Sequence, residues 1–228
     1  WMTAAGENGI PTAFVVDGTG QIVWIGHPMS DLEPTLNKVL AGSWNVADFK
    51  AKRAKEQAAK EARVRLNRQI DPLMQQGKYA QALKVLDAAI ARDKSLEKDY
   101  AMMRISILAR FDEPQAQKYA LTVAGRFFKN EPPALNQLAW MIVADDTPLK
   151  KPNYQIGLQI AAMAAQASNN NDPDILDTLA MAQFKAGKGA LAATTQTRAV
   201  ALAKKTGRPA DMIAEMEQHL ARFKKGRK

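Results

Sequence analysis

The sequence contains no cysteine and only two histidines among its 228 residues. Without cysteine, thiol redox catalysis, thiolate zinc sites, disulfide bonds and cysteine nucleophiles are excluded from anything that this polypeptide does alone. The two histidines, His27 and His219, are far apart in the sequence. A multi-histidine metal site or a serine-histidine triad is therefore not expected. We predict no catalytic residue, no metal and no cofactor within this chain.

Long hydrophobic runs are also missing. The longest stretch without a charge, residues 153–171, holds several Gln and Asn side chains. These side chains are costly in hydrocarbon, so no membrane span is predicted. The composition, 46% apolar and 24% charged, is that of a soluble globular protein. The chain starts at Trp1 without a basic and then apolar leader, so we expect that processing or truncation has removed the true start.

Charge is distributed unevenly along the chain. The net charge is +9, but residues 1–44 have a single Lys against four acidic residues. This asymmetry predicts two units with a boundary near residue 45. The basic balance of the whole favours an acidic partner. Nucleic acid is a disfavoured partner, because no zinc-finger, aromatic RNA-binding or recognition-helix signature accompanies the charge.

The first unit begins with a predicted β-hairpin. Residues 13–16 and 22–25 are β-branched and aromatic runs joined by a DGTG turn. Ser30 and Glu33 have capping-box spacing and predict a helix start, and Gly42 suits the helix end. Such a small segment cannot bury its own apolar faces. We expect it to be covered by the helical part or by another chain, or to be partly disordered.

These residues resemble a known family. The run GIPTAFVVD at residues 9–17, the glycine turn, IVWIG at residues 22–26 and the short helix resemble the last third of thioredoxin-like redoxins. That family includes thiol-disulfide oxidoreductases and peroxiredoxin-like proteins. The resemblance covers residues 1–44 and implies that the family's first strands and nucleophilic cysteine pair precede residue 1. Relatives often work outside the cytoplasm, which the resemblance implies as the setting.

The resemblance also implies a site. In the family, the proline that matches Pro11 has a cis peptide bond and faces the active-site disulfide. The preceding residue, here Ile10, offers its backbone to bound peptide. Ile10, Pro11 and Thr12 are therefore the substrate-groove residues that the resemblance implies. From the residues alone, Pro11 equally suits a proline that opens a strand where no ladder donor is needed, and both peptide isomers stay open.

The rest of the chain predicts helices. Residues 48–68 carry eight basic and three acidic residues. They predict an exposed linker helix over 45–68, which we interpret as a solvated connection. An arm for nucleic acid or anionic lipid is the less favoured alternative, since no aromatic residues interleave and no wide apolar stripe is present.

Internal repetition follows the linker. Gly77 and Gly187 each have Ala five and twelve residues later, and each follows a helical pattern. These are helix-turn-helix units that resemble tetratricopeptide repeats, in which small residues allow close helix packing. Two degenerate units are expected between them, at 98–128 and from 132 to 167. In the polar cluster at 169–173 we favour helix capping by Asp172 over a calcium site.

The predicted fold is mostly α: a tetratricopeptide-like α-solenoid preceded by a partial thioredoxin-like hairpin plus helix. The domains are a thioredoxin-like part over 1–44, the linker over 45–68, repeats over 69–207, and a capping helix with a basic tail over 208–228. On the capping helix, His219 is interpreted as a surface or edge residue. The predicted function is a fragment of a redoxin-type thiol-disulfide oxidoreductase that carries a protein-interaction domain. The alternative is a non-catalytic scaffold whose stacked helices offer a groove to a peptide or protein.

Overall fold

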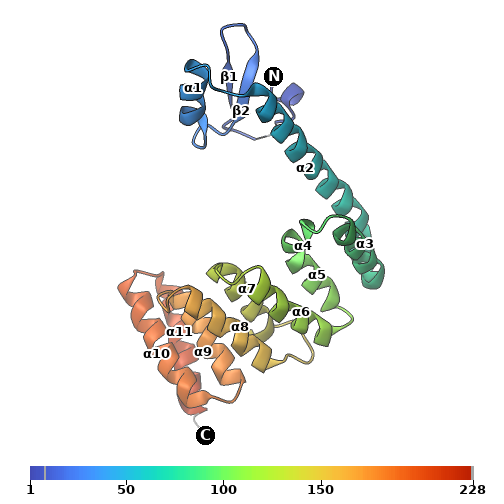
Figure 1. The fold of residues 1–228 in the computed structure, drawn as a ribbon. Helices are drawn as coiled ribbons and strands as arrows, with labels where there is room; N and C mark the ends of the chain where they lie inside the picture. The colour runs from blue at the N-terminus through green and yellow to red at the C-terminus, as the bar shows by residue number, and fades with distance from the viewer. Residues whose placement is uncertain (8, 227–228) are drawn as a thin grey trace. The chain divides into compact units, whose positions relative to one another are not determined.

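The fold is mostly helical, as predicted. The computed structural model describes residues 1–7 and 9–226, and in this part it has eleven α-helices and one two-stranded antiparallel sheet (Figure 1). The chain forms two compact units, Trp1–Asn67 and Arg68–Lys228. The last two residues of the predicted basic tail, 227–228, lie outside the described residues.

The predicted hairpin is confirmed. After a short 3-10 helix, Thr3–Ala5, strand β1 (Ala13–Val16) pairs antiparallel with β2 (Ile22–Gly26). One carboxylate oxygen of Asp17 accepts from the backbone N–H and the hydroxyl of Thr19 and from the backbone N–H of Gln21. These bonds, led by the Thr19 hydroxyl, lower the pKa of Asp17. The turn is thus closed by its own first side chain.

The hairpin is covered by α1 (Leu32–Leu40) and by the first turns of α2 (Val46–Gln75). The indole N–H of Trp44 donates to the backbone oxygen of Val23 at 2.9 Å and fixes the start of α2 beside β2. Of the three expectations for this segment, cover by the helical part is the one that the structure shows. The cluster consists of Val15, Val23 and Trp24, with Ala13, Leu32, Val39, Trp44, Val46 and Phe49 packed around them.

The predicted capping box at Ser30 and Glu33 is wrong. Helix α1 begins at Leu32, and the residue before it gives no side-chain cap. The hydroxyl of Ser30 instead donates to the backbone oxygen of His27 at 2.7 Å. The hydroxyl thus closes the turn that precedes the helix and makes no cap at the helix N-terminus. The predicted helix end is confirmed, with Gly42 at φ +67°.

Helix α2 continues without a break through the predicted linker and beyond it. Pro72 lies inside the helix near its end. Basic side chains are paired along the exposed surface, as with Lys52 and Glu56 at 3.9 Å and Arg65 and Glu61 at 3.6 Å. Pairs of this kind add only tenths of a kcal/mol each, about 0.3–0.5. The helix is therefore held by many small contributions.

The second unit is built from consecutive helices. Helix α7 packs on α8 and α9 on α10, while α9 also contacts α7, α8 and α11. The predicted break in the segment 98–128 falls between α5 and α6, and the predicted capping helix is α11. The helices after α2 are α3 (Tyr79–Arg92), α4 (Leu96–Asp99), α5 (Ala101–Leu108), α6 (Glu113–Arg126), α7 (Pro132–Val143), α8 (Tyr154–Ala167), α9 (Pro173–Lys185), α10 (Gly189–Lys205) and α11 (Ala210–Lys225).

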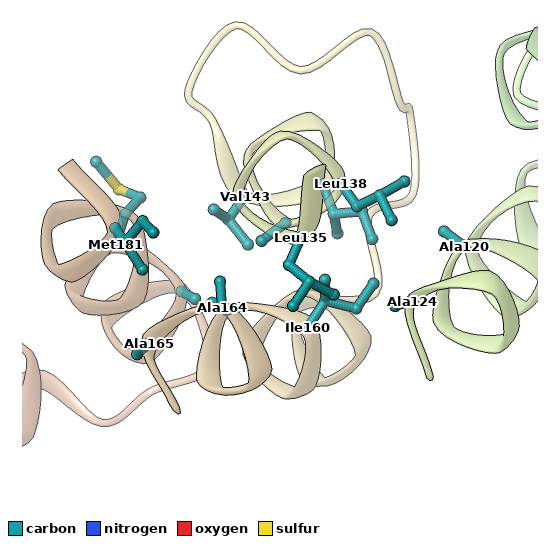
Figure 2. Packing of buried hydrophobic residues seen from close by; sticks show 14 of the residues in the cluster. Ala120, Ala124, Leu135, Leu138, Val143, Ile160, Ala164, Ala165 and Met181 are labelled. Carbon is teal, nitrogen blue, oxygen red and sulfur yellow. The ribbon is translucent and has the colours of Figure 1, made fainter. Parts of the chain in front are cut away.

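One continuous core joins helices α5 to α11. Figure 2 shows side chains such as Leu135 and Ile160 meeting between α7 and α8, with Met181 of α9 on one side and Ala120 and Ala124 of α6 on the other. All five are at most 1% exposed. Burial of apolar surface on this scale is the main stabilising term of the unit.

The predicted caps and turns are confirmed at several helix ends. Asp172 accepts from the backbone N–H groups of Asp174 and Ile175, so it caps α9 as expected. At Gly77 and Gly187 the chain turns with φ +70° and +79°. In both turns, the glycine N–H donates to the backbone oxygen three residues earlier. The N–H of the lysine that follows donates to the backbone oxygen five residues before that lysine. This is the Schellman ending that favours glycine.

Gly157 allows a close contact between α7 and α8 in the core. A Cβ atom at this position on α8 would lie 2.5 Å from Cγ1 of Val143 and 3.2 Å from Cγ2 of Ile142, both on α7. The separation of α7 and α8 therefore depends on a residue without a side chain.

We predict that Gly157→Ala destabilises the protein by about 1 kcal/mol. The overpacking cost of roughly 1–3 kcal/mol exceeds the helix-propensity gain of about 1 kcal/mol. The matched control is Gly125→Ala on α6, where the added Cβ would meet only a methionine methyl at 4.0 Å. Gly125→Ala should stabilise by about 0.5–1 kcal/mol. Urea unfolding followed by circular dichroism measures both, and stabilisation by Gly157→Ala would contradict the packing account.

Candidate functional site

The residues implied by the redoxin resemblance lie in the loop before β1. The Ile10–Pro11 peptide bond is cis. The hydroxyl of Thr12 donates to the backbone oxygen of Gly9 at 2.7 Å, and Ile10 is 92% exposed. The structure thus brings these residues together in one loop, with one apolar side chain facing solvent.

A pocket of about 640 Å³ lies within the first unit, between β2, α1 and the start of α2. Its wall contains the aromatic side chains of Trp24, Trp44 and Phe49 and charges of both signs. Acidic Asp48 and Glu56 alternate with basic Lys52 and Arg53 along α2. The site has no net electrostatic preference that points to one ligand.

A second pocket, of about 250 Å³, lies within the second unit. Three helices form it: α7 contributes Asn136 and Trp140, α9 contributes Asp174, Asp177 and Thr178, and α11 contributes Met212, Glu215 and Met216. These helices are separated in sequence by α8 and α10. We call this site the α7–α9–α11 pocket.

Asp177 anchors one wall of the α7–α9–α11 pocket. Its Oδ1 accepts from Nε2 of Gln196 on α10 and lies 3.0 Å from Nδ1 of His219 on α11. The same Nε2 atom donates to the backbone oxygen of Met216 at 3.0 Å. This buried set of bonds fixes α11 against α9 and α10, which positions the residues that α11 gives to the pocket.

The interpretation of His219 as a surface or edge residue is wrong. Its side chain is only 14% exposed, because it packs against Asp177 and stacks on the ring of Phe223. The hydrogen bond with Asp177 raises the pKa of His219 above its usual value, against the opposing effect of burial. The protonated imidazole is thus favoured in the folded protein.

Asp174 lies beside Asp177 on α9. Its Oδ2 pairs with the guanidinium of Arg208 at 2.7 Å, while its Oδ1 is buried and receives no hydrogen bond from any described residue. Burial raises the pKa of the Asp174 carboxyl, although Arg208 acts in the opposite direction. A buried acceptor without a donor is uncommon in native proteins and leaves bonding capacity at the pocket wall.

A second carboxylate network lies outside the pocket. Asp145, just after α7, binds the guanidinium of Arg222 on α11 and the ammonium of Lys185 on α9. Arg222, with Lys185, holds the pKa of Asp145 well below its usual range. Asp145 lies two residues beyond the end of α7 at Val143. Its partners show a structural role as an interhelix tie.

Neither a metal centre nor a membrane segment emerges from the geometry. Among the described residues, no group of three or more His, Asp or Glu side chains is arranged to hold a metal ion. In the same part of the chain, none of the helices combines the length and apolarity needed to cross a bilayer.

The comparisons with known proteins give no relative. No protein-family model, no curated protein and no solved structure matches the chain.

The sequence did not reveal the α7–α9–α11 pocket. Its residues are spread from Asn136 to Met216, and no local spacing marks them as a group. The signal that was available is chemical: α9 places Asp174 and Asp177 three residues apart, on the same side of a helix.

We predict a pH-dependent contribution of His219 to stability. Because its pKa is raised in the folded state, the contribution is complete below the unfolded pKa of about 6.5 and is lost as the pH rises through the folded pKa. His219→Gln should therefore lower the free energy of unfolding by about 1 kcal/mol at pH 5.5 and by less at pH 9. Denaturant unfolding at both pH values measures this, with His27→Gln as control. An equal or larger loss at pH 9 would contradict the prediction.

Proposed function

We propose that the second unit is a helical-repeat protein-interaction module and that the α7–α9–α11 pocket is part of its peptide-binding surface. Support for repeats comes from the pairing of α7 with α8 and of α9 with α10. Stacked helix pairs of this kind place the first helix of each pair side by side. A peptide can then contact several helices at once.

One observation carries the proposal. The first helices of two successive pairs, α7 and α9, and the closing helix α11 all contribute side chains to one pocket. The pocket exposes Trp140 of α7 and Met212 of α11, at 36% and 37%. Exposed aromatic and Met side chains in a concave site are typical of interface anchors.

We predict that Trp140→Ser weakens peptide binding by about tenfold or more, the effect of removing an aromatic anchor. Peptides are selected on the full chain from a phage-displayed random dodecamer library, synthesised and measured by calorimetry. Phe111→Ser is the matched control, because Phe111 is 50% exposed and lies outside the pocket. Selected peptides that bind Trp140→Ser as well as the wild type would overturn the assignment of the site. Selection of no peptide would overturn the function.

A second proposal concerns the first unit. We propose that residues 1–44 are the C-terminal part of a thioredoxin-like redoxin whose parent exchanges disulfides or reduces peroxides. The observation that favours it is the hairpin with α1 packed on it, together with the exposed Ile10 in the loop that enters β1. Ile10 and Pro11 are exposed, so the backbone of this loop is open to a bound peptide, the role that the resemblance implies. In this proposal, the helical module holds the partner of the redox domain.

We predict that this polypeptide, having no cysteine, reduces neither insulin disulfides nor hydrogen peroxide. A version extended upstream by its natural coding sequence should do one or the other. In the active version, Ile10→Asp should lower kcat/KM by about tenfold, since the groove loses an apolar contact and gains a charge. Leu40→Asp, at an exposed residue at the end of α1, is the control. Inactivity of the extended version in both assays would remove the redox proposal.

A further inference from the structure

We propose that the α7–α9–α11 pocket receives a single cationic side chain, lysine or arginine, from the bound peptide. This inference rests on the proposed peptide-binding function and adds the chemistry of the ligand. The net charge of the chain is +9, which by itself would favour an acidic ligand and not a cationic side chain.

The lining of the pocket is acidic. Asp174, Asp177 and Glu215 contribute to it, whereas no Lys or Arg is among the lining residues. Among the described residues, Glu215 has no ion-pair partner, whereas Asp174 pairs with Arg208 and Asp177 with His219. Glu215 is therefore the carboxylate of the lining whose charge is least compensated, and it favours a cation by Coulomb attraction at short range.

The apolar part of the lining suits the stem of a long basic side chain. Trp140, Met212 and Met216 come from helices on two sides of the pocket. Lysine and arginine lay their methylene groups on such surfaces while the charged end reaches polar groups. An indole face also attracts a cation directly.

Acceptors are available for the charged end. Oδ1 of Asn136 and Oδ1 of Asp174 are buried and receive no hydrogen bond from the described residues. Both residues line the pocket. Ammonium and guanidinium groups are pure donors, so they complement a wall whose unused groups are acceptors. An acidic side chain in the same place would face like charges.

The size of the pocket limits the ligand to one side chain. Its volume of about 250 Å³ is below the range of roughly 300–1,000 Å³ that is typical of sites for whole small molecules. The remainder of the peptide would lie outside the pocket. The inference therefore concerns one anchor residue and not a basic stretch.

The test uses three pools of random decapeptides that carry Arg, Glu or Leu fixed at the central position. Binding to the full chain is followed by the indole N–H signal of Trp140 in ¹⁵N NMR, assigned with Trp140→Phe. We expect the Arg pool to shift this signal at concentrations at which the Glu and Leu pools do not. Because surface charges are screened by salt, the Arg pool should bind more weakly at 0.5 M than at 0.05 M salt.

Variants test the carboxylates. Glu215→Gln should weaken the Arg pool by about two- to fivefold, the range expected for one partly exposed charge. Glu217→Gln removes the same charge from the same helix at a residue that pairs with Lys204 outside the pocket. It is the matched control and should have little effect.

The outcomes separate this inference from the proposed function. If the Leu pool shifts the Trp140 signal as strongly as the Arg pool, the cationic anchor is overturned while the pocket remains a peptide site. Equal effects of Glu215→Gln and Glu217→Gln also overturn the anchor. If no pool shifts the signal at any concentration reached, the inference and the proposed peptide site fall together.

Discussion

Close contact between helices with small residues at the crossing is the constraint on which the second unit depends. Because Gly157 has no side chain, α8 approaches Val143 of α7 so closely that a Cβ atom at residue 157 would not fit. Buried alanines do the same elsewhere, with Ala120 and Ala124 on α6 and Ala164 on α8. Interiors are packed like crystals, so helix positions are set by such contacts to within a fraction of an ångström. The place of α7 beside α9, and with it the pocket, follows from this packing.

The pocket has a second dependence, on the polar contacts that hold α11. Asp177 accepts from Gln196 and pairs with His219, so one carboxylate joins α9, α10 and α11. Asp145 makes a comparable tie from the end of α7 through Arg222. These contacts favour one position of α11, because a displaced α11 would take His219 away from Asp177 and Arg222 away from Asp145. The acidic lining is thus partly a consequence of how the last helix is attached.

The sequence predicted the features whose causes are local. The Asp172 cap and the glycine turns at Gly77 and Gly187 depend on residues within five positions of each other, and the hairpin joins two runs that are neighbours in the sequence. Ser30 shows the limit of this reasoning, because its hydroxyl donates to His27 in the turn before the helix and does not cap the helix N-terminus. The burial of His219 and the α7–α9–α11 pocket could not be predicted in this way. The residues that meet there are tens of positions apart in the sequence, and a helical pattern does not indicate which face of a helix a later helix will cover.

The basic charge of the chain and the acidic pocket act over different distances. Charges spread over the surface are screened beyond about 8 Å at physiological ionic strength, so they govern encounter and not the fit of a bound side chain. Inside the pocket, the carboxylates of α9 and α11 are the nearest charges, and they decide which side chain is stabilised there. Under these proposals, a partner that is acidic overall and carries one exposed Lys or Arg is attracted both by the basic surface and by the acidic pocket. A strongly basic partner would be opposed by the rest of the surface before it reached the pocket.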